Sequence, residues 1–252
     1  MSPTDSPPGL SDEQLQEFLG LIDGADSVEL KLTVPDEDRR STVVALDLDP
    51  LDAYLRQVFF FDTPDLALNQ KGIVARARRT QGDPDDSVIK LRPVVPQELP
   101  DDVRSSKTFV VEVDAMPGGY VCSGSFKGKV DTGDVKQAVA GERPLHKLFS
   151  KQQRAYFEQH APDAIELDDL SILGPVTVLK LKTSPEGFDR KLAVELWMYP
   201  DGSHILELST RCKTDEAFQV GAEARAFLIG RGVNLAGKQE TKTRAALEYF
   251  SG

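Results

Sequence analysis

The chain has 252 residues, of which 40% are hydrophobic and 28% are charged, a balance typical of a globular protein that buries a core. Its formal net charge of −11 argues against a protein that coats nucleic acid or an acidic membrane, and no apolar run approaches the ~18 residues of a membrane span. The two cysteines, Cys122 and Cys212, form no Cys-x-x-Cys pair. The sequence therefore predicts a protein of the reducing cytoplasm, without a disulfide or a zinc site.

The chain is expected to begin with a short disordered leader over residues 1–10, which lack the basic and apolar regions of a signal peptide. A helix is predicted to follow at Ser11, because Ser-Asp-Glu-Gln has the form of a capping box and apolar residues come after it at helical spacing. Gly24 is expected to end this helix. The apolar residues then recur at every second position, which predicts strands.

Turn residues bound most of the predicted strands, and Asp201-Gly202 between the last two is the clearest hairpin signal. The predicted strands are SVELKLTV from Ser27, TVVALDL, RQVFFFD, GIVARARR, SVIKLR, TFVVEVD, PVTVLKLKT, DRKLAVELWMY and SHILELSTRC. Further helices are predicted over about 135–160, 216–230 and 241–250. This pattern suggests one domain of about eight to ten strands with helices packed outside.

Charged residues at alternate positions of these strands are the most informative feature of the sequence. The pairs that share a face include Arg76 with Arg78, Lys90 with Arg92, Glu112 with Asp114, and Lys180 with Lys182. Like charges side by side are unfavourable unless a counter-charge lies between them. Two arrangements explain such faces: the solvated side of a sandwich, or the polar interior of a wide barrel whose apolar outside is covered by helices.

Four stretches, in this order, resemble the CYTH (triphosphate tunnel metalloenzyme) family. They are SVELKLTV, FFFDTPDLALNQKGIVARARR, FVVEVD and YPDGSHILELS. The resemblance implies a mainly β fold with peripheral helices: a closed antiparallel eight-stranded β-barrel tunnel with a polar lumen. It implies a single tunnel domain over 11–252, with a helical insertion around 132–161 and C-terminal helices.

The resemblance also implies roles for residues at the matching positions. The metal-binding role falls on Glu29, Glu112, Asp114 and Glu207. The phosphate-binding role falls on Lys31, Arg76, Arg78, Lys90, Lys180, Lys182 and Lys242. Two positions depart from the family pattern, because Ser27 and Ser209 stand where the opening and late motifs carry a second glutamate.

The chemistry of these residue types fits a triphosphate bound through a metal. Arginine and lysine neutralise phosphate oxygens, and carboxylates are the hard oxygen ligands that Mg²⁺ or Mn²⁺ requires. No serine, cysteine or histidine is assigned as a nucleophile. The expected function is metal-dependent hydrolysis of inorganic or organic triphosphate, a small-molecule substrate. The alternatives are a class IV-type adenylate cyclase and a non-catalytic polyphosphate- or nucleotide-binding module. Ser27 and Ser209 favour the non-catalytic module.

Overall fold

The structure is a computed structural model that describes residues 11–237, 239 and 241–251. The leader predicted over residues 1–10 lies outside the described residues. The strands are β1 (Ser27–Val34), β2 (Tyr54–Asp62), β3 (Ile73–Thr80), β4 (Asp85–Leu91), β5 (Phe109–Met116), β6 (Gly119–Val130), β7 (Ser171–Thr183), β8 (Leu192–Met198) and β9 (His204–Cys212). The helices are α1 (Asp12–Asp23), α2 (Arg39–Ala45), α3 (Ala67–Gln70), α4 (Asp101–Arg104), α5 (Asp134–Val139), α6 (Lys151–His160), α7 (Ala217–Gly230) and α8 (Lys242–Ser251).

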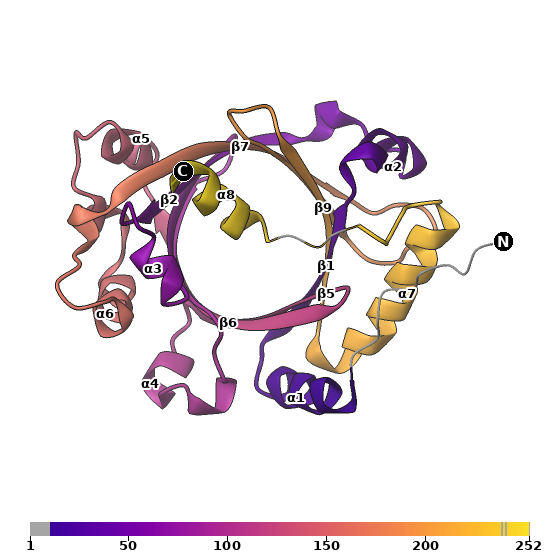
Figure 1. The fold of residues 1–252 in the computed structure, drawn as a ribbon, viewed down its shortest axis with the longest axis horizontal. Coiled ribbons are helices and arrows are strands. Elements are labelled where there is room, and N and C mark those ends of the chain that lie inside the picture. Colours follow the sequence, from indigo (N-terminus) through magenta and orange to yellow (C-terminus); the bar gives the residue numbers. More distant parts are fainter. Residues whose placement is uncertain (1–10, 238, 240, 252) are drawn as a thin grey trace. The chain divides into compact units, whose positions relative to one another are not determined.

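The strands form a closed barrel in the order β1-β5-β6-β4-β3-β2-β7-β8-β9 (Figure 1). Strand β1 is antiparallel to β9 but parallel to β5. The expected eight-stranded, wholly antiparallel barrel is therefore wrong in strand number and in direction. The two errors have one cause, because the directions of nine strands cannot alternate all the way around a closed sheet, and at least one neighbouring pair must run parallel.

Strand β6 has no counterpart among the predicted strands, because its glycines and serines interrupt the apolar alternation. A Cβ atom at Gly124 would lie 2.6 Å from the ring of Phe109, and one at Gly128 would lie 2.6 Å from Gln153 Oε1. These glycines mark places where other side chains approach the strand closely. From propensity alone, these glycines predict a turn and not a strand.

The prediction of a strand for TVVALDL is also wrong, because most of this segment lies in helix α2 and the turn that follows it. Thr42 and Leu46, four residues apart, are both buried, whereas Val44 is 79% exposed. A spacing of four belongs to a helix, and in so short a segment it competes with the alternation expected of a strand.

Several other predicted elements are confirmed. Helix α1 begins after Ser11 with the capping box, in which the Ser11 hydroxyl accepts from Gln14 N, and Gly24 caps its end. Strands β8 and β9 form the antiparallel hairpin at Asp201-Gly202, with Gly202 at φ +87°. Helices α5 and α6 lie in the stretch predicted to be helical before His160. Both cysteines are buried free thiols.

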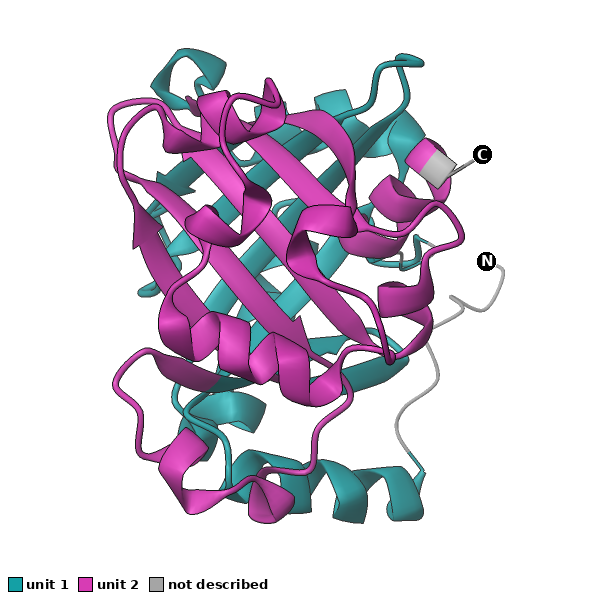
Figure 2. Ribbon diagram, turned by 90° about the vertical axis from the view of Figure 1, so that its left-hand side faces the viewer, with its two compact units in different colours: residues 1–53, 111–122, 179–241 teal, residues 54–110, 123–178, 242–252 magenta. Residues whose placement is uncertain are grey.

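The chain divides into two compact units, coloured teal and magenta in Figure 2. The first unit contains residues 1–53, 111–122 and 179–241, and the second contains residues 54–110, 123–178 and 242–252. Each unit is assembled from three separate stretches of the chain. The expectation of a single domain over 11–252 stays a prediction.

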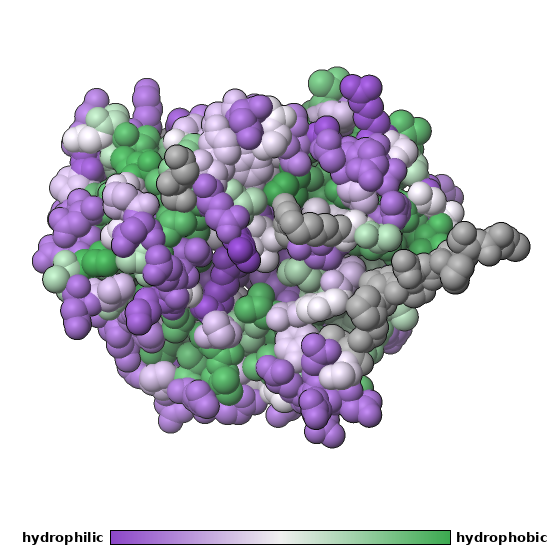
Figure 3. All heavy atoms as spheres, in the orientation of Figure 1, coloured by the Kyte–Doolittle hydropathy of each residue, from purple (hydrophilic) through white to green (hydrophobic). Residues whose placement is uncertain are grey.

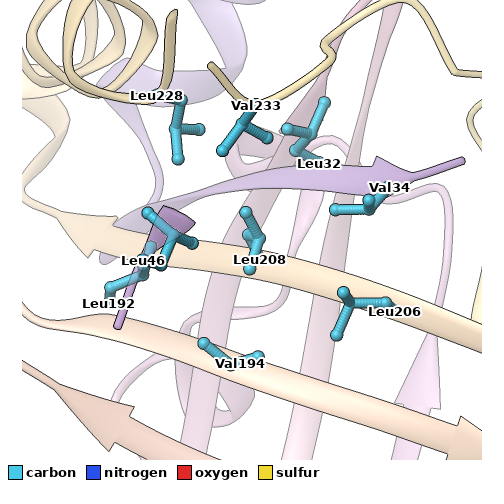
Figure 4. Close-up of a cluster of buried hydrophobic side chains, with 9 residues drawn as sticks. All are labelled: Leu32, Val34, Leu46, Leu192, Val194, Leu206, Leu208, Leu228 and Val233. Atoms are coloured by element: carbon cyan, nitrogen blue, oxygen red, sulfur yellow. The ribbon is translucent and has the colours of Figure 1, made fainter. Parts of the chain in front are cut away.

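The core of the first unit lies on the apolar side of its strands. Leu32, Leu208 and Val194 from β1, β9 and β8 belong to one buried cluster with Leu46 and with Leu228 from α7 (Figure 4). The alternate residues of the same strands are polar, as β1 shows with Glu29 and Lys31. The apolar side is thus covered by helices, and the charged side is the opposite one.

The second unit repeats this arrangement around helix α6. Phe109, Phe126 and Tyr156 pack with ring centroids 4.8–5.6 Å apart. Gln153 is fully buried and its amide donates to Ser87 O at 3.0 Å. On the face drawn in Figure 3, hydrophilic residues alternate with smaller apolar areas. None of the described helices is both long and apolar enough to cross a membrane.

Candidate functional site

The charged side of the first unit is organised by the register of β1 with its two neighbours. Glu29 lies opposite Asp114 of β5 and opposite Arg211 of β9. Residues opposite each other on neighbouring strands project from the same side of a sheet. We call this side the first charged face; its members are Glu29, Lys31, Glu112, Asp114, Glu195, Glu207, Ser209 and Arg211.

Three carboxylates gather on this face. Glu29, Glu112 and Asp114 each offer an oxygen within 4.8 Å of the other two, and we call them the acidic triad. Glu112 and Asp114 are 8% and 5% exposed. Ionised carboxylates this close repel one another, and burial strengthens the repulsion, so the triad requires cations.

Two cationic side chains from the same face meet this requirement. Lys31 Nζ lies 2.8 Å from Asp114 Oδ1 and 3.2 Å from Glu29 Oε2. Arg211 contacts Glu112 directly, and its guanidinium lies 3.9 Å from Glu29 Oε2. The triad is therefore bridged from one side by a lysine and from the other by an arginine.

The surroundings hold Lys31 in its charged form. Burial lowers the pKa of its ammonium, but the carboxylates of Asp114 and Glu29 raise it by more, so the pKa lies above its ordinary value. Glu207 acts in the same direction, which places this carboxylate within electrostatic reach of Lys31. Glu207 is itself only 5% exposed.

Ser209, one of the two departures from the family pattern, takes part in the same network. Its hydroxyl donates to Glu29 Oε1 at 3.1 Å. The hydroxyl thus orients a member of the triad instead of adding a further negative charge to it. Ser27 lies opposite Glu112 in the register of β1 with β5.

A second ion pair lies further along the face. Lys180 Nζ lies 2.5 Å from Glu195 Oε1, and Trp197 Nε1 donates to Glu195 Oε2 at 3.1 Å. Glu195 is the register partner of Glu207. Lys182, two residues beyond Lys180 on β7, is exposed.

The second unit carries the other basic residues expected to bind phosphate. Arg76, Arg78 and Lys90 project from one side of β3 and β4, which we call the second charged face. Arg78 Nε donates to both oxygens of Asp86, at 2.9 and 3.0 Å. Arg79 projects from the other side of β3 and donates to Gln57 Oε1 at 2.8 Å. Lys242 begins helix α8.

Most of the expected residues thus lie in two sets, one in each unit. Arg211 and Glu195 belong to the first set but were assigned no role from the sequence, which left open whether Glu195 lies beside Glu207 or forms a salt bridge facing a helix. Their signal was present, because Arg211 lies two residues after Ser209 on the same strand and Glu195 alternates with apolar residues on β8.

The acidic triad fits a hard divalent cation by its donor type. Carboxylate oxygens suit Mg²⁺ and Mn²⁺, whereas the described part of the face offers them no histidine or thiolate. Glu29, Glu112 and Asp114 are the residues that would hold such an ion, with Glu207 close by. A bound metal ion would compete with Lys31 and Arg211 for the same carboxylate oxygens.

The Asp62-Thr63-Pro64 segment, which carries part of the family resemblance, has a structural role. The Asp62 carboxylate accepts from the backbone N–H of Thr63, Leu68 and Asn69 at 2.8–3.0 Å. These bonds fix the turn that leads into helix α3. Burial raises the pKa of Asp62, although the hydrogen bonds act in the opposite direction.

Comparison with known proteins identifies the fold. No protein-family model and no curated protein matches the sequence. A solved structure from Hippeastrum, of a protein provisionally named an adenylyl cyclase and described as having a dominant triphosphatase activity, matches with a TM-score of 0.66 and 16% identity, over 88% of this chain and 95% of that one. A Bacillus halodurans protein provisionally named an adenylate cyclase matches with a TM-score of 0.60 and 14% identity, over 87% and 97%. The chain therefore has the fold of these two proteins.

Proposed function

We propose that this protein binds a triphosphate together with Mg²⁺ or Mn²⁺ and hydrolyses it. The observation that carries the proposal is the acidic triad, in which Glu29, Glu112 and Asp114 converge although they repel one another. Groups brought together at such a cost are typical of a site that binds an ion. The likeness to a structure described as a triphosphatase supports the same function.

The proposal assigns different tasks to the two charged faces. When bound at the triad, the metal supplies a Lewis acid that polarises phosphate oxygens and acidifies water. Lys31 and Arg211 exchange their carboxylate partners for phosphate oxygens, which arginine can bind through two N–H groups at once. Arg76 and Lys90 of the second charged face are side chains of the type that binds phosphate oxygens, and Arg78 beside them is held in place by Asp86.

A second function is favoured by a specific observation. The triad already has Lys31 and Arg211 as partners, and Ser209 replaces a carboxylate, so the site carries less negative charge for a metal than the family pattern. These features favour a protein that binds triphosphate without turning it over. The adenylate cyclase alternative rests on the names of the two similar structures.

One substrate panel separates these functions. The purified chain is incubated with tripolyphosphate, thiamine triphosphate or ATP, with Mg²⁺ or Mn²⁺, and phosphate, pyrophosphate and cyclic AMP are measured. We expect metal-dependent release of phosphate. Cyclic AMP with pyrophosphate would establish the cyclase instead, and saturable binding without any product would establish the binding module.

The Glu207→Gln variant tests whether the first charged face carries the activity. A positioned charged group in an active site is typically worth ~10²- to 10³-fold in rate, so turnover should fall by about this factor. Stability should change little, because the substitution opens no apolar void. Glu158→Gln, an exposed position on α6, is the matched control. Equal turnover of Glu207→Gln and the parent chain at saturating metal would contradict the assignment.

A further inference from the structure

The first unit contains an apolar cavity on the side of its strands opposite the first charged face. Its volume is about 260 Å³, and it lies between helix α7 and the strands β1 and β9. The side chains that define it include Leu30, Leu32, Leu192, Leu208, Leu228 and Leu235. Figure 4 shows four of these, Leu32, Leu192, Leu208 and Leu228, as members of the buried cluster.

One wall of the cavity is a glycine in the interior of a helix. Gly221 is the fifth residue of α7 and has an ordinary helical backbone. Glycine at such a position costs roughly 0.5–1 kcal/mol relative to alanine. A Cβ atom there would meet only Leu30 Cδ1, at 3.9 Å, which is ordinary contact. Close packing therefore does not require glycine, and its effect is to keep the cavity open.

The cavity is poorly suited to water. Thr210 contributes a hydroxyl to the lining, but this group already donates to Lys191 O at 3.0 Å. The ammonium of Lys31 is engaged with the acidic triad on the other side of the sheet. The cavity is open to solvent at its rim, and its walls are mainly apolar, so an apolar occupant fits them better than water does.

The lining also indicates what the occupant carries at its end. Arg225 lies one turn after Gly221 on α7, lines the same cavity and is exposed, so its guanidinium reaches solvent while its stem borders apolar groups. Met116 contributes an unbranched side chain that adapts to different shapes. An apolar chain with an anionic head satisfies both parts of this lining.

We propose that the cavity binds a medium-chain fatty acid or a similar anionic amphiphile, with its chain against Gly221 and its head at Arg225. The site is separate from the acidic triad and does not depend on the function proposed for it. The bound amphiphile would link α7 to β1 and β9, because its hydrocarbon chain would contact residues of all three elements.

The test uses decanoate, below its micelle concentration, with the full chain in calorimetry and thermal unfolding. The parent chain should bind it saturably and melt at a higher temperature in its presence. Gly221→Leu should melt higher without ligand, because the cavity is filled and a helix glycine removed, and should bind decanoate at least tenfold more weakly. Ala222→Leu, an exposed neighbour on α7, should bind like the parent chain.

Two further variants complete the test. Ala224→Leu fills the same cavity from the next residue of its lining and should also weaken binding, which covers the case in which Gly221→Leu does not fold. Arg225→Gln should weaken binding of decanoate but leave that of decanol unchanged. Tripolyphosphate should not displace decanoate. Absence of saturable binding to the parent chain, or equal affinity in Gly221→Leu, would overturn the proposal.

Discussion

The two units carry charged faces of opposite composition. On the first charged face, five carboxylates accompany Lys31 and Arg211, with Lys180 of β7 beside Glu195, and each of these cations contacts at least one of the carboxylates. On the second, Arg76, Arg78 and Lys90 accompany Asp86, whose two carboxylate oxygens both accept from Arg78. The same alternation of charged and apolar residues thus produces an acid-rich surface in one unit and a base-rich surface in the other.

This difference separates two kinds of ligand. An acid-rich face gains from a small cation, whereas a base-rich face gains from an anion with several oxygens. A metal–triphosphate complex offers both. Variants of the two faces should therefore fail in different assays.

The largest effect is expected for metal binding to the acidic triad. Glu112→Gln removes one of the three converging carboxylates while leaving a side chain of the same shape. Loss of a supporting partner of a metal ligand typically costs 10- to 100-fold in affinity, and loss of a ligand should cost at least about as much. Mn²⁺ titration by calorimetry measures it. An affinity equal to that of the parent chain would remove the triad as the metal site.

The next effect concerns anion binding to the second charged face. At 100 times its dissociation constant, a ligand adds about 2.7 kcal/mol of stability, which raises the melting midpoint of a chain of this size by roughly 5–10 °C. Arg76→Gln should remove most of this shift for tripolyphosphate. Arg79→Gln is the matched control, because Arg79 follows on the same strand but projects from its other side. Equal shifts in both variants would contradict the assignment of faces.

A smaller effect is expected at Arg211, which competes with a metal for the triad. Arg211→Gln should raise the affinity for Mn²⁺ several-fold, because Glu112 loses a cationic partner. The Arg211 side chain is 52% exposed, so loss of its ion pair should cost less than about 1 kcal/mol of stability. Lower Mn²⁺ affinity in this variant would show that Arg211 supports the metal site instead of competing for it.

The smallest effect concerns the hydrogen-bonded contact of Asp168 with His146 in the second unit, which no ligand should influence. Burial acts to raise the pKa of Asp168, but hydrogen bonds from the backbone and ring of His146 outweigh it and hold the pKa below its ordinary value. The stability that this group contributes is therefore complete above its unfolded pKa of about 3.9 and disappears as the pH falls through the folded value.

The Asp168→Asn variant measures that contribution. Its melting midpoint should lie below that of the parent chain at pH 7, and the gap should shrink as the pH falls below about 4. Tripolyphosphate and Mn²⁺ should leave the gap unchanged. A gap that persists at low pH would show that Asp168 stabilises the fold without its charge.

The sequence predicted the strands and their charged sides well, because alternation is a local property. Glu29 and Lys31 had to share a side of β1 whatever the rest of the chain did. The partners of these residues were harder to predict. Nothing in the neighbourhood of Arg211 indicates that β9 would place it between Glu29 and Glu112, because register is a property of the assembled sheet.

The errors have a similar origin. The glycines of β6 reflect the approach of Phe109 and Gln153, and helix α2 replaces a predicted strand because Leu46 packs in the buried cluster of the first unit. In both cases tertiary packing outweighs local propensity. Arg79 shows the same dependence, because its hydrogen-bond partner Gln57 lies on another strand.

The parallel pairing of β1 with β5 has a consequence for the order of folding. Ser209 and Glu29 are separated by 180 residues of sequence. Glu29 and Asp114 are also far apart in the sequence, with several strands and helices between them. Contacts of such high sequence separation form slowly, whereas the β8–β9 hairpin closes through a two-residue turn. The acidic triad is therefore expected to form late in folding. During refolding, Mn²⁺ binding should recover more slowly than the β-strand signal in circular dichroism. The rate of that recovery would measure how fast β1 pairs with β5.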